Sequence, residues 1–227
     1  AQLDDEPADV AEALDEQYRP RFAGDELPQT ATGIAVSLAE KLDTIVGLFG
    51  IGQPPSGVKD PFALRRAALG VLRIIIERQL SLDLFELISE AVNNFVDILT
   101  EDDVTTQVMQ YFYDRLRGYV IDQGAKADEY ESVLAVSPTQ PLDFMQRLNA
   151  VAEFRKLEQA ESLAAGNKRI GNILRKNEAE QEGLVVEPGL LVEPAEKALA
   201  EQVVAAQQAL KPLYAASDFA AAGAWFR

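Results

Sequence analysis

Apolar residues recur every three or four positions along most of the chain, which is the spacing that places side chains on one face of an α-helix. The spacing is dense between residues 30 and 48, which predicts a mostly buried helix. Glycine and proline cluster at residues 50–57, the clearest internal boundary. No segment alternates apolar and polar residues over a useful length, so no strand is expected. The pattern predicts an all-α fold with helices over residues 9–18, 30–48, 61–79, 84–99, 101–121, 128–135, 142–157, 160–176 and 195–210.

The helix predicted at residues 61–79 has a distinctive beginning. Asp60 is expected to cap it, because a carboxylate there can accept the free backbone N–H groups of the first turn. Pro61 suits the first helical position, where no N–H donor is needed. The polar side of this helix is a narrow stripe of Arg66, Gly70, Arg73 and Glu77.

Two interpretations of this stripe are open. In one, Gly70 leaves room for a backbone to approach, and the guanidiniums of Arg66 and Arg73 bind phosphate. In the other, Arg73 pairs with Glu77 one turn later and Arg66 is solvated. Spacing alone favours the second interpretation.

Composition narrows the chemistry that the chain can perform. The 227 residues are 48% hydrophobic, so the chain can bury a core, and their net charge of −16 would repel nucleic acid over most of the surface. The absence of cysteine excludes disulfides, thiolate catalysis and Cys-based zinc sites. The absence of histidine removes the commonest general base and metal ligand, so any catalysis would depend on carboxylates or lysines.

Membrane and targeting signals are not found in the sequence. No apolar run approaches the roughly 20 residues that a membrane span needs, and the N-terminus has no signal-peptide pattern. The chain begins at Ala1 without a methionine and stops at Arg227 after two aromatic residues, so we expect it to be part of a longer polypeptide. Residues 178–193 are acidic and contain two Glu-Pro pairs, which predicts an exposed loop.

A local reversal of charge marks residues 145–176. This window holds seven basic and three acidic residues in a chain that is otherwise strongly acidic, a pattern typical of an electrostatic footprint for nucleic acid. Lys168, Asn172 and Arg175 are expected to share one side of a helix, with Arg169 beside them.

The same helix carries apolar residues that are expected to face a core. Its charged residues are mixed with asparagine, as in surfaces that contact both phosphates and bases. A solvated helix face is the alternative, and the sequence favours neither interpretation. The residues expected to face the core are Ile170, Ile173 and Leu174.

Two further groups of residues have simpler interpretations. Glu40 and Asp43 lie three residues apart and could share a cation, yet a solvated role is favoured because no histidine is available to complete a site. Residues 111–113 are Tyr-Phe-Tyr and could stack on bases, but their place in an apolar helical pattern favours a core position.

Five segments of the chain carry a more specific signal. They are QYRPRFAGD at 17–25, AEKLDTIVG at 39–47, FGIGQ at 49–53, KDPFALRRAALGVLRI at 59–74 and NKRIGNIL at 167–174. Together they closely resemble the beta subunits of the bacterial heterotetrameric glycyl-tRNA synthetases. The similarity follows the order of the chain and extends over nearly all of it.

The resemblance implies a subunit of an α2β2 enzyme that joins glycine to its tRNA with ATP. In that family the alpha subunit activates glycine, using ATP and Mg²⁺, and the beta subunit recognises tRNA. The expected partners are tRNA(Gly), the alpha subunit and a second beta subunit, in the cytoplasm, with no membrane and no DNA. This segment of the enzyme is expected to be non-catalytic, with no catalytic residue, metal or cofactor of its own.

The resemblance also implies two domains. Residues 1–57 would be the C-terminal part of an HD-like helical domain, and residues 58–227 a helical anticodon-binding domain, incomplete at its C-terminus. The segment DPFALR at 60–65 would be this chain's form of the Asp-Ala-Leu-Arg signature that similar domains of arginyl-tRNA synthetases carry. An HD-type hydrolase is not expected, because the chain has no histidine and has Glu40 where those hydrolases place aspartate.

With the resemblance, the arginine stripe and the charge reversal become candidate surfaces for tRNA. Anticodon bases are splayed and can be read by stacking and by Arg, Lys or Asn contacts. Asp60, Leu64 and Leu69 are expected to build and pack the helix instead. The alternative function is a helical protein-interaction scaffold without RNA binding, which the acidic body and the Leu/Val-rich segment 184–192 would suit. The expected tRNA-binding residues are Arg65, Arg66, Arg73, Lys168, Arg169, Asn172 and Arg175.

Overall fold

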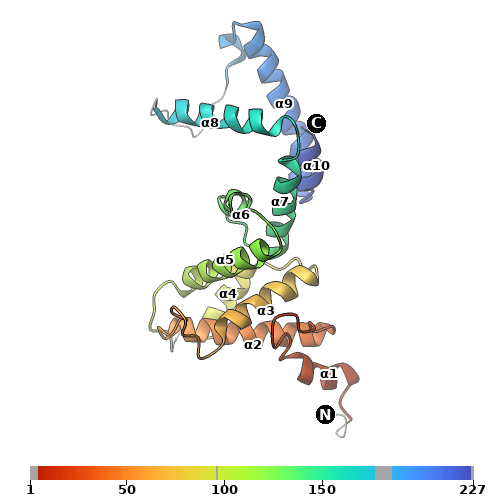
Figure 1. The fold of residues 1–227 in the computed structure, drawn as a ribbon, viewed down its shortest axis with the longest axis vertical. Coiled ribbons are helices and arrows are strands. Elements are labelled where there is room, and N and C mark those ends of the chain that lie inside the picture. Colours follow the sequence, from red (N-terminus) through yellow and green to blue (C-terminus); the bar gives the residue numbers. More distant parts are fainter. Residues whose placement is uncertain (1–4, 96, 177–185, 226–227) are drawn as a thin grey trace. The chain divides into compact units, whose positions relative to one another are not determined.

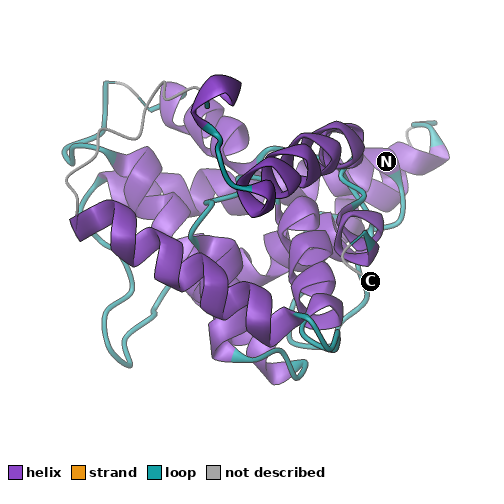
Figure 2. Cartoon of the chain, turned by 90° about the horizontal axis from the view of Figure 1, so that it is seen from above, coloured by secondary structure: helices purple, strands orange, loops and turns teal. Residues whose placement is uncertain are grey.

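The protein is helical throughout the part that the computed structural model describes, residues 5–95, 97–176 and 186–225. Within these ranges the other regular features are a 3₁₀ turn at Pro188–Leu190 and an isolated β-bridge between Ser56 and Lys59, so the predicted all-α fold is confirmed (Figures 1 and 2). The helices are α1 (Ala8–Glu16), α2 (Ala31–Gly50), α3 (Leu64–Glu77), α4 (Leu84–Asn93), α5 (Val104–Asp122), α6 (Ala127–Leu134), α7 (Pro141–Phe154), α8 (Ala160–Lys176), α9 (Pro194–Ala215) and α10 (Phe219–Ala224).

The chain forms two compact units, Ala1–Met145 and Gln146–Arg227. In the first unit, α2 packs against α3, α4 and α5, and α1 packs against α2 (Figure 1). Helix α2, which precedes the domain boundary expected at residue 57, therefore shares a compact unit with helices that follow it. The boundary at residue 57 stays a prediction.

The core of the first unit is built from the apolar faces of these helices. Each Val, Ile, Leu or Phe side chain that is fully buried contributes about 1.5–3 kcal/mol to folding, so these faces supply most of the stabilisation. The apolar pattern predicted this arrangement for α2 and α3. The apolar residues with no exposed surface are Ile45, Val46, Ala68, Val71, Ile74, Ile75, Ile88, Val108 and Phe144.

Several helix ends follow local signals that the sequence contains. Helix α8 begins and ends at the predicted residues. Thr30, predicted as the first residue of a helix, caps α2 instead, with its hydroxyl accepting the N–H of Gly33 at 2.9 Å. Helix α4 was predicted to reach residue 99 but ends at Asn93. Beyond that point Leu99 packs against Gly50, and the Gly50 carbonyl accepts the N–H of Thr100 at 2.8 Å, so tertiary contacts replace the last helical turn.

The second unit differs most from the prediction. Ile170, Ile173 and Leu174 of α8 are 57%, 49% and 37% exposed, so their expected place in a core is wrong. Helix α9 was predicted to end at residue 210 and continues to Ala215, and α10 was not predicted. The α10 residue Phe219 is buried, with its ring 5.7 Å from that of Tyr214.

The exposed loop expected at residues 178–193 is only partly visible. Residues 177–185 lie outside the described part of the chain. Among the described residues, no helix is long and apolar enough to cross a lipid bilayer.

Candidate nucleic-acid interface

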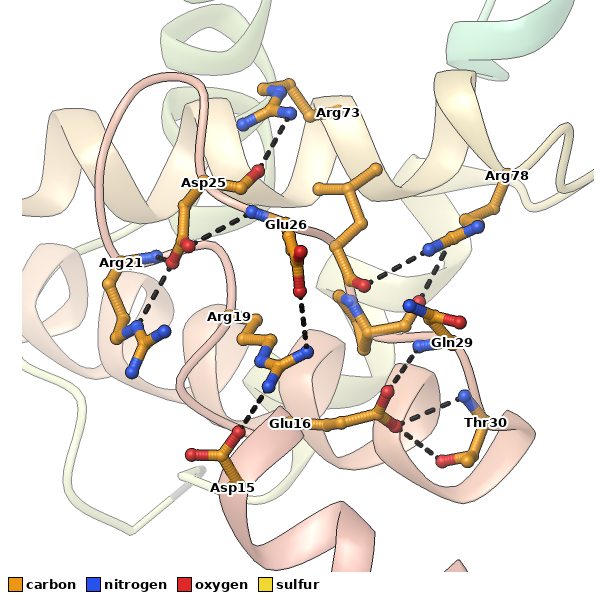
Figure 3. Close-up of polar contacts among 12 residues, drawn as sticks. Asp15, Glu16, Arg19, Arg21, Asp25, Glu26, Gln29, Thr30, Arg73 and Arg78 are labelled. Carbon is orange, nitrogen blue, oxygen red and sulfur yellow. Dashed lines mark hydrogen bonds and ion pairs between the residues drawn. The ribbon is translucent and has the colours of Figure 1, made fainter.

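Residues 21–28, the 21–28 segment, belong to the connection between α1 and α2. This segment lies against α3 and is held there by arginines (Figure 3). Arg66 donates to the carbonyl of Arg21 at 3.2 Å, and Arg73 donates to the carbonyl of Asp25 at 3.2 Å. Arg78, directly after α3, donates to two further carbonyls of this segment at 3.0 and 3.1 Å. The arginine stripe predicted as an RNA-binding surface therefore also binds the chain's own backbone.

The neighbours of this stripe distinguish the two interpretations of it. The Nε of Arg73 lies 2.7 Å from Oε1 of Glu77, so the pairing that spacing favoured is confirmed. Arg66 is exposed, but its bond to the 21–28 segment means that it is not only solvated. Gly70 is buried, and a Cβ there would lie 3.2 Å from Cε of Lys41 and 3.3 Å from Cγ of Pro20. The room beside this glycine is thus used by this chain.

Helix α3 begins at Leu64, three residues later than predicted. The expected place of Pro61 at the first helical position is wrong, because Pro61 lies in the preceding turn. Ala63 has a left-handed φ of 55° and directs the chain into the helix. Asp60 still caps it as expected, since its two oxygens accept the N–H groups of Leu64 at 2.8 Å and Arg65 at 3.0 Å.

Replacing Asp60 by alanine should destabilise the first unit by about 1 kcal/mol, because two N–H groups of the first turn of α3 would lose their acceptor. Asp60→Asn keeps one acceptor oxygen and should recover part of this loss. Urea unfolding followed by far-ultraviolet circular dichroism measures both variants. An Asp60→Ala variant as stable as the wild type would show that water caps the helix equally well.

A groove of about 530 Å³ lies between α3 and α5 within the first unit. Arg65 and Arg73 line it from α3, and Arg115 and Tyr119 line it from α5. Arg115 lies over the ring of Tyr111, with its Cζ 5.5 Å from the ring centroid. Arg115 is not among the residues predicted from the sequence, although its spacing of four residues from Tyr111 and from Tyr119 is a signal that could have indicated it.

Helix α8 presents the other predicted residues, and all four are exposed. Arg175 donates to Oδ1 of Asn172 at 2.6 Å. Lys168 and Arg169 form no hydrogen bond or ion pair with the residues that the structure describes. The helix therefore brings together free cationic groups and an amide, as its spacing predicted.

The seven predicted residues fall into two sets. Three lie on α3 in the first unit, and four lie on α8 in the second. Each set is a candidate surface within its own unit.

The remaining candidates have structural roles. Lys41 lies between Glu40 and Asp43 in sequence. It is buried, and its ammonium group donates to the hydroxyl of Ser37 at 2.9 Å. Burial lowers the pKa of Lys41, and the nearby Glu40 carboxylate opposes this shift. No cluster of three or more potential metal ligands occurs among the described residues. Phe112 is buried in the core, which confirms the interpretation favoured for it.

Comparison with known proteins identifies the family. A sequence profile described as "Glycyl-tRNA synthetase beta subunit" matches residues 1–135. The chain belongs to the glycyl-tRNA synthetase beta subunit family. Proteins named "Glycine–tRNA ligase beta subunit" are 52% identical to it over 219 residues in Marinobacter nauticus, 53% over 219 in Photobacterium profundum and 54% over 217 in Pseudomonas aeruginosa.

The extent of these matches confirms the resemblance found in the sequence. Each covers 96% of this chain, so the similarity includes α8 as well as the first unit. Each also covers only 32% of the relative, so the chain spans about a third of the length of the glycyl-tRNA synthetase beta subunits that it matches.

Proposed function

We propose that this chain recognises tRNA as part of the beta subunit of glycine–tRNA ligase. Its relatives carry that name, and the observation that supports a role in RNA binding is the exposed basic stripe of α8. Lys168 and Arg169 have no acceptor in the described part of the chain, which leaves them available for phosphates. Such groups stand out in a chain whose net charge is −16.

The proposal includes a division of labour. Residues 58–227 would read the anticodon of tRNA(Gly), and residues 1–57 would belong to an HD-like helical domain. The alpha subunit would carry out glycine activation with ATP and Mg²⁺, in a cytoplasmic α2β2 assembly. This chain would hold tRNA so that its acceptor end reaches that subunit, without a catalytic group of its own.

The three cationic residues of α8 provide the first test. Changing Lys168, Arg169 and Arg175 together to alanine should weaken tRNA(Gly) binding and flatten the dependence of log K on log salt by up to about three counterions. Fluorescence anisotropy with labelled tRNA across a salt series measures both quantities. An unchanged slope would remove α8 from the interface.

A control with the same loss of charge separates local contacts from the overall field. Lys59, Lys197 and Lys211 are exposed and lie outside residues 145–176, so their combined replacement by alanine should leave the slope close to that of the wild type. A tRNA with altered anticodon bases tests the finer proposal. Equal affinity for both tRNAs would contradict anticodon reading but not RNA binding.

A protein-interaction scaffold is the second candidate function, and the exposed apolar residues of the second unit favour it. Besides Ile170 and Ile173 of α8, Leu199 and Val203 of α9 are 64% and 47% exposed. Apolar surface of this kind suits a protein partner. A chain that binds the alpha subunit but no tRNA at low salt would support the scaffold and refute tRNA recognition.

A further inference from the structure

In and beside the groove between α3 and α5, some hydrogen-bond donors have no acceptor among the residues that the structure describes. Arg115 forms no hydrogen bond or ion pair with the residues that the structure describes, and its contact is with the ring of Tyr111. Its Nε is shielded from solvent and unpaired in that part of the chain. Nη1 of Arg73 and the hydroxyl of Tyr111 are shielded and unpaired in the same way.

Unpaired buried donors require a physical explanation, because native proteins satisfy nearly all such groups. The chain has 37 acidic residues, yet no carboxylate among those described pairs with Arg115. A ligand with several acceptor atoms could satisfy these donors. An ionised phosphate group accepts hydrogen bonds, and its geometry suits the planar guanidinium of arginine.

The charges that line the groove favour an anion. Three arginines and two carboxylates contribute to the lining, and one carboxylate, Glu77, is already bound to Arg73 at 2.7 Å. Arg65 and Arg115 then face a single remaining carboxylate, Asp122. Arg65 uses only Nη2 within the described chain, in a 2.5 Å bond to the carbonyl of Gly57.

The buried hydroxyl of Tyr111 lies beside the groove, and its pKa is affected by two of the same arginines. Burial raises the pKa of Tyr111 to about 12, and Arg115 is the strongest influence that opposes this rise. Arg65 opposes it as well, while Asp60 adds to it. Both guanidiniums therefore oppose the rise in the pKa of the same buried hydroxyl.

We propose that this groove binds a phosphate group, held by Arg115 together with Arg65. In the tRNA complex proposed above, this phosphate belongs to the tRNA backbone. The source of the phosphate therefore rests on that proposed function, whereas phosphate binding in the groove does not. The proposal requires the long side chain of Arg115 to rotate, so that its shielded Nε turns toward the phosphate. Position 118 on α5 offers room for the ligand, since among the described residues no atom beyond its chain neighbours and the nearby backbone of α5 lies within 4 Å of a Cβ placed there.

Salt-dependent tRNA binding tests the role of Arg115. Arg115→Gln should lower the slope of log K against log salt by about one and weaken binding roughly threefold at low salt. Arg117 is the matched control, because it lies two residues away on α5, outside the groove, and pairs with Glu131 at 3.2 Å. Arg117→Gln should leave the slope unchanged.

A second variant tests the groove without removing an arginine. Gly118→Glu places a carboxylate in the open space beside Arg115, where it should replace the phosphate and reduce tRNA binding as Arg115→Gln does. Gly118→Gln has nearly the same size without the charge and should bind more tightly than Gly118→Glu. Equal affinities of the two position-118 variants would contradict a charged ligand in the groove.

Inorganic phosphate provides a test that does not depend on RNA. Added at constant ionic strength, it should shift the Nε–H resonance of Arg115 in the NMR spectrum of the wild type and not in that of Gly118→Glu. A moved resonance with no tRNA binding supports the groove and refutes the proposed function. A reduced slope in Arg115→Gln supports a tRNA phosphate. An unmoved resonance together with equal slopes for Arg115→Gln and Arg117→Gln overturns the inference.

Discussion

Replacing Gly33 by alanine should destabilise the first compact unit by about 3 kcal/mol. A Cβ at this position of α2 would lie 2.7 Å from the Cβ of Glu16 in α1 and would overlap the Glu16 carboxylate. That carboxylate accepts the N–H of Gln29 at 2.6 Å and both the N–H and the hydroxyl of Thr30, at 3.1 and 2.5 Å. The added methyl group would therefore separate α1 from α2 or break these bonds.

Gly118→Ala is the matched control for this prediction. It also places alanine at a helical glycine, but in open space, and alanine favours a helix over glycine by about 1 kcal/mol. Its stability should be unchanged or slightly higher. The single tryptophan, Trp225, lies in the second unit, so amide hydrogen exchange of α1 and α2 is the appropriate measurement. Equal protection in both variants would contradict the close contact of α1 and α2.

The Glu16→Gln variant should lose about 2 kcal/mol of stability at neutral pH. Glu16 is 1% exposed, and its carboxylate satisfies donors at the beginning of α2 (Figure 3). Glutamine has the same shape but only one acceptor oxygen. Its amide NH₂ group would face the donor of Gln29 or those of Thr30, depending on which oxygen it replaces, and at least one donor would lose its partner.

The same variant should remove part of the pH dependence of stability. Burial by itself would raise the pKa of Glu16, but the hydrogen bonds from Thr30 and Gln29 outweigh it and hold the pKa below its ordinary value of 4.5. The ionised carboxylate therefore stabilises the fold above pH 4.5, and this contribution is lost as the pH falls through the lowered pKa. Urea unfolding at a series of acidic pH values should show a steeper loss for the wild type than for Glu16→Gln.

Asp15→Asn is the control for both effects of Glu16. Asp15 precedes Glu16 directly and pairs with Arg19 at 2.6 Å, but its side chain is 58% exposed. Exposed ion pairs contribute about 0–1 kcal/mol, so this variant should lose less than Glu16→Gln. If the two variants lost equal stability, the burial of the Glu16 carboxylate would not be the cause.

Local signals predicted the helices with long apolar faces and clear caps. Helix α2 repeats apolar residues over five turns after Thr30, a residue that caps through its own hydroxyl. Asp60 was correctly identified as a capping group, because a carboxylate just before a helix has few other partners as favourable. The left-handed turn at Ala63 was not predicted, since alanine adopts this conformation only where its surroundings require it.

Contacts between distant residues account for one of the errors, and the other two concern features that a periodic pattern does not reveal. Helix α4 ends early because Leu99 and Thr100 contact Gly50, about fifty residues earlier in the chain. The apolar residues of α8 are exposed. The sequence did not indicate this, because periodicity alone cannot tell a helix face that packs on a core from one that does not. Helix α10 has only six residues, too few for a periodic signal.

The sequence by itself determined the all-α class, the family, the basic character of α8 and the absence of histidine and cysteine chemistry, because periodicity, composition and ordered similarity are properties of the chain. Only the tertiary structure decided what each cationic group contacts. It paired Arg66 and Arg73 with the backbone of the 21–28 segment, and it placed Arg115 without a described partner beside Arg65. Side chains on different helices meet only through packing, so spacing along one helix can indicate a stripe but not what lies against it.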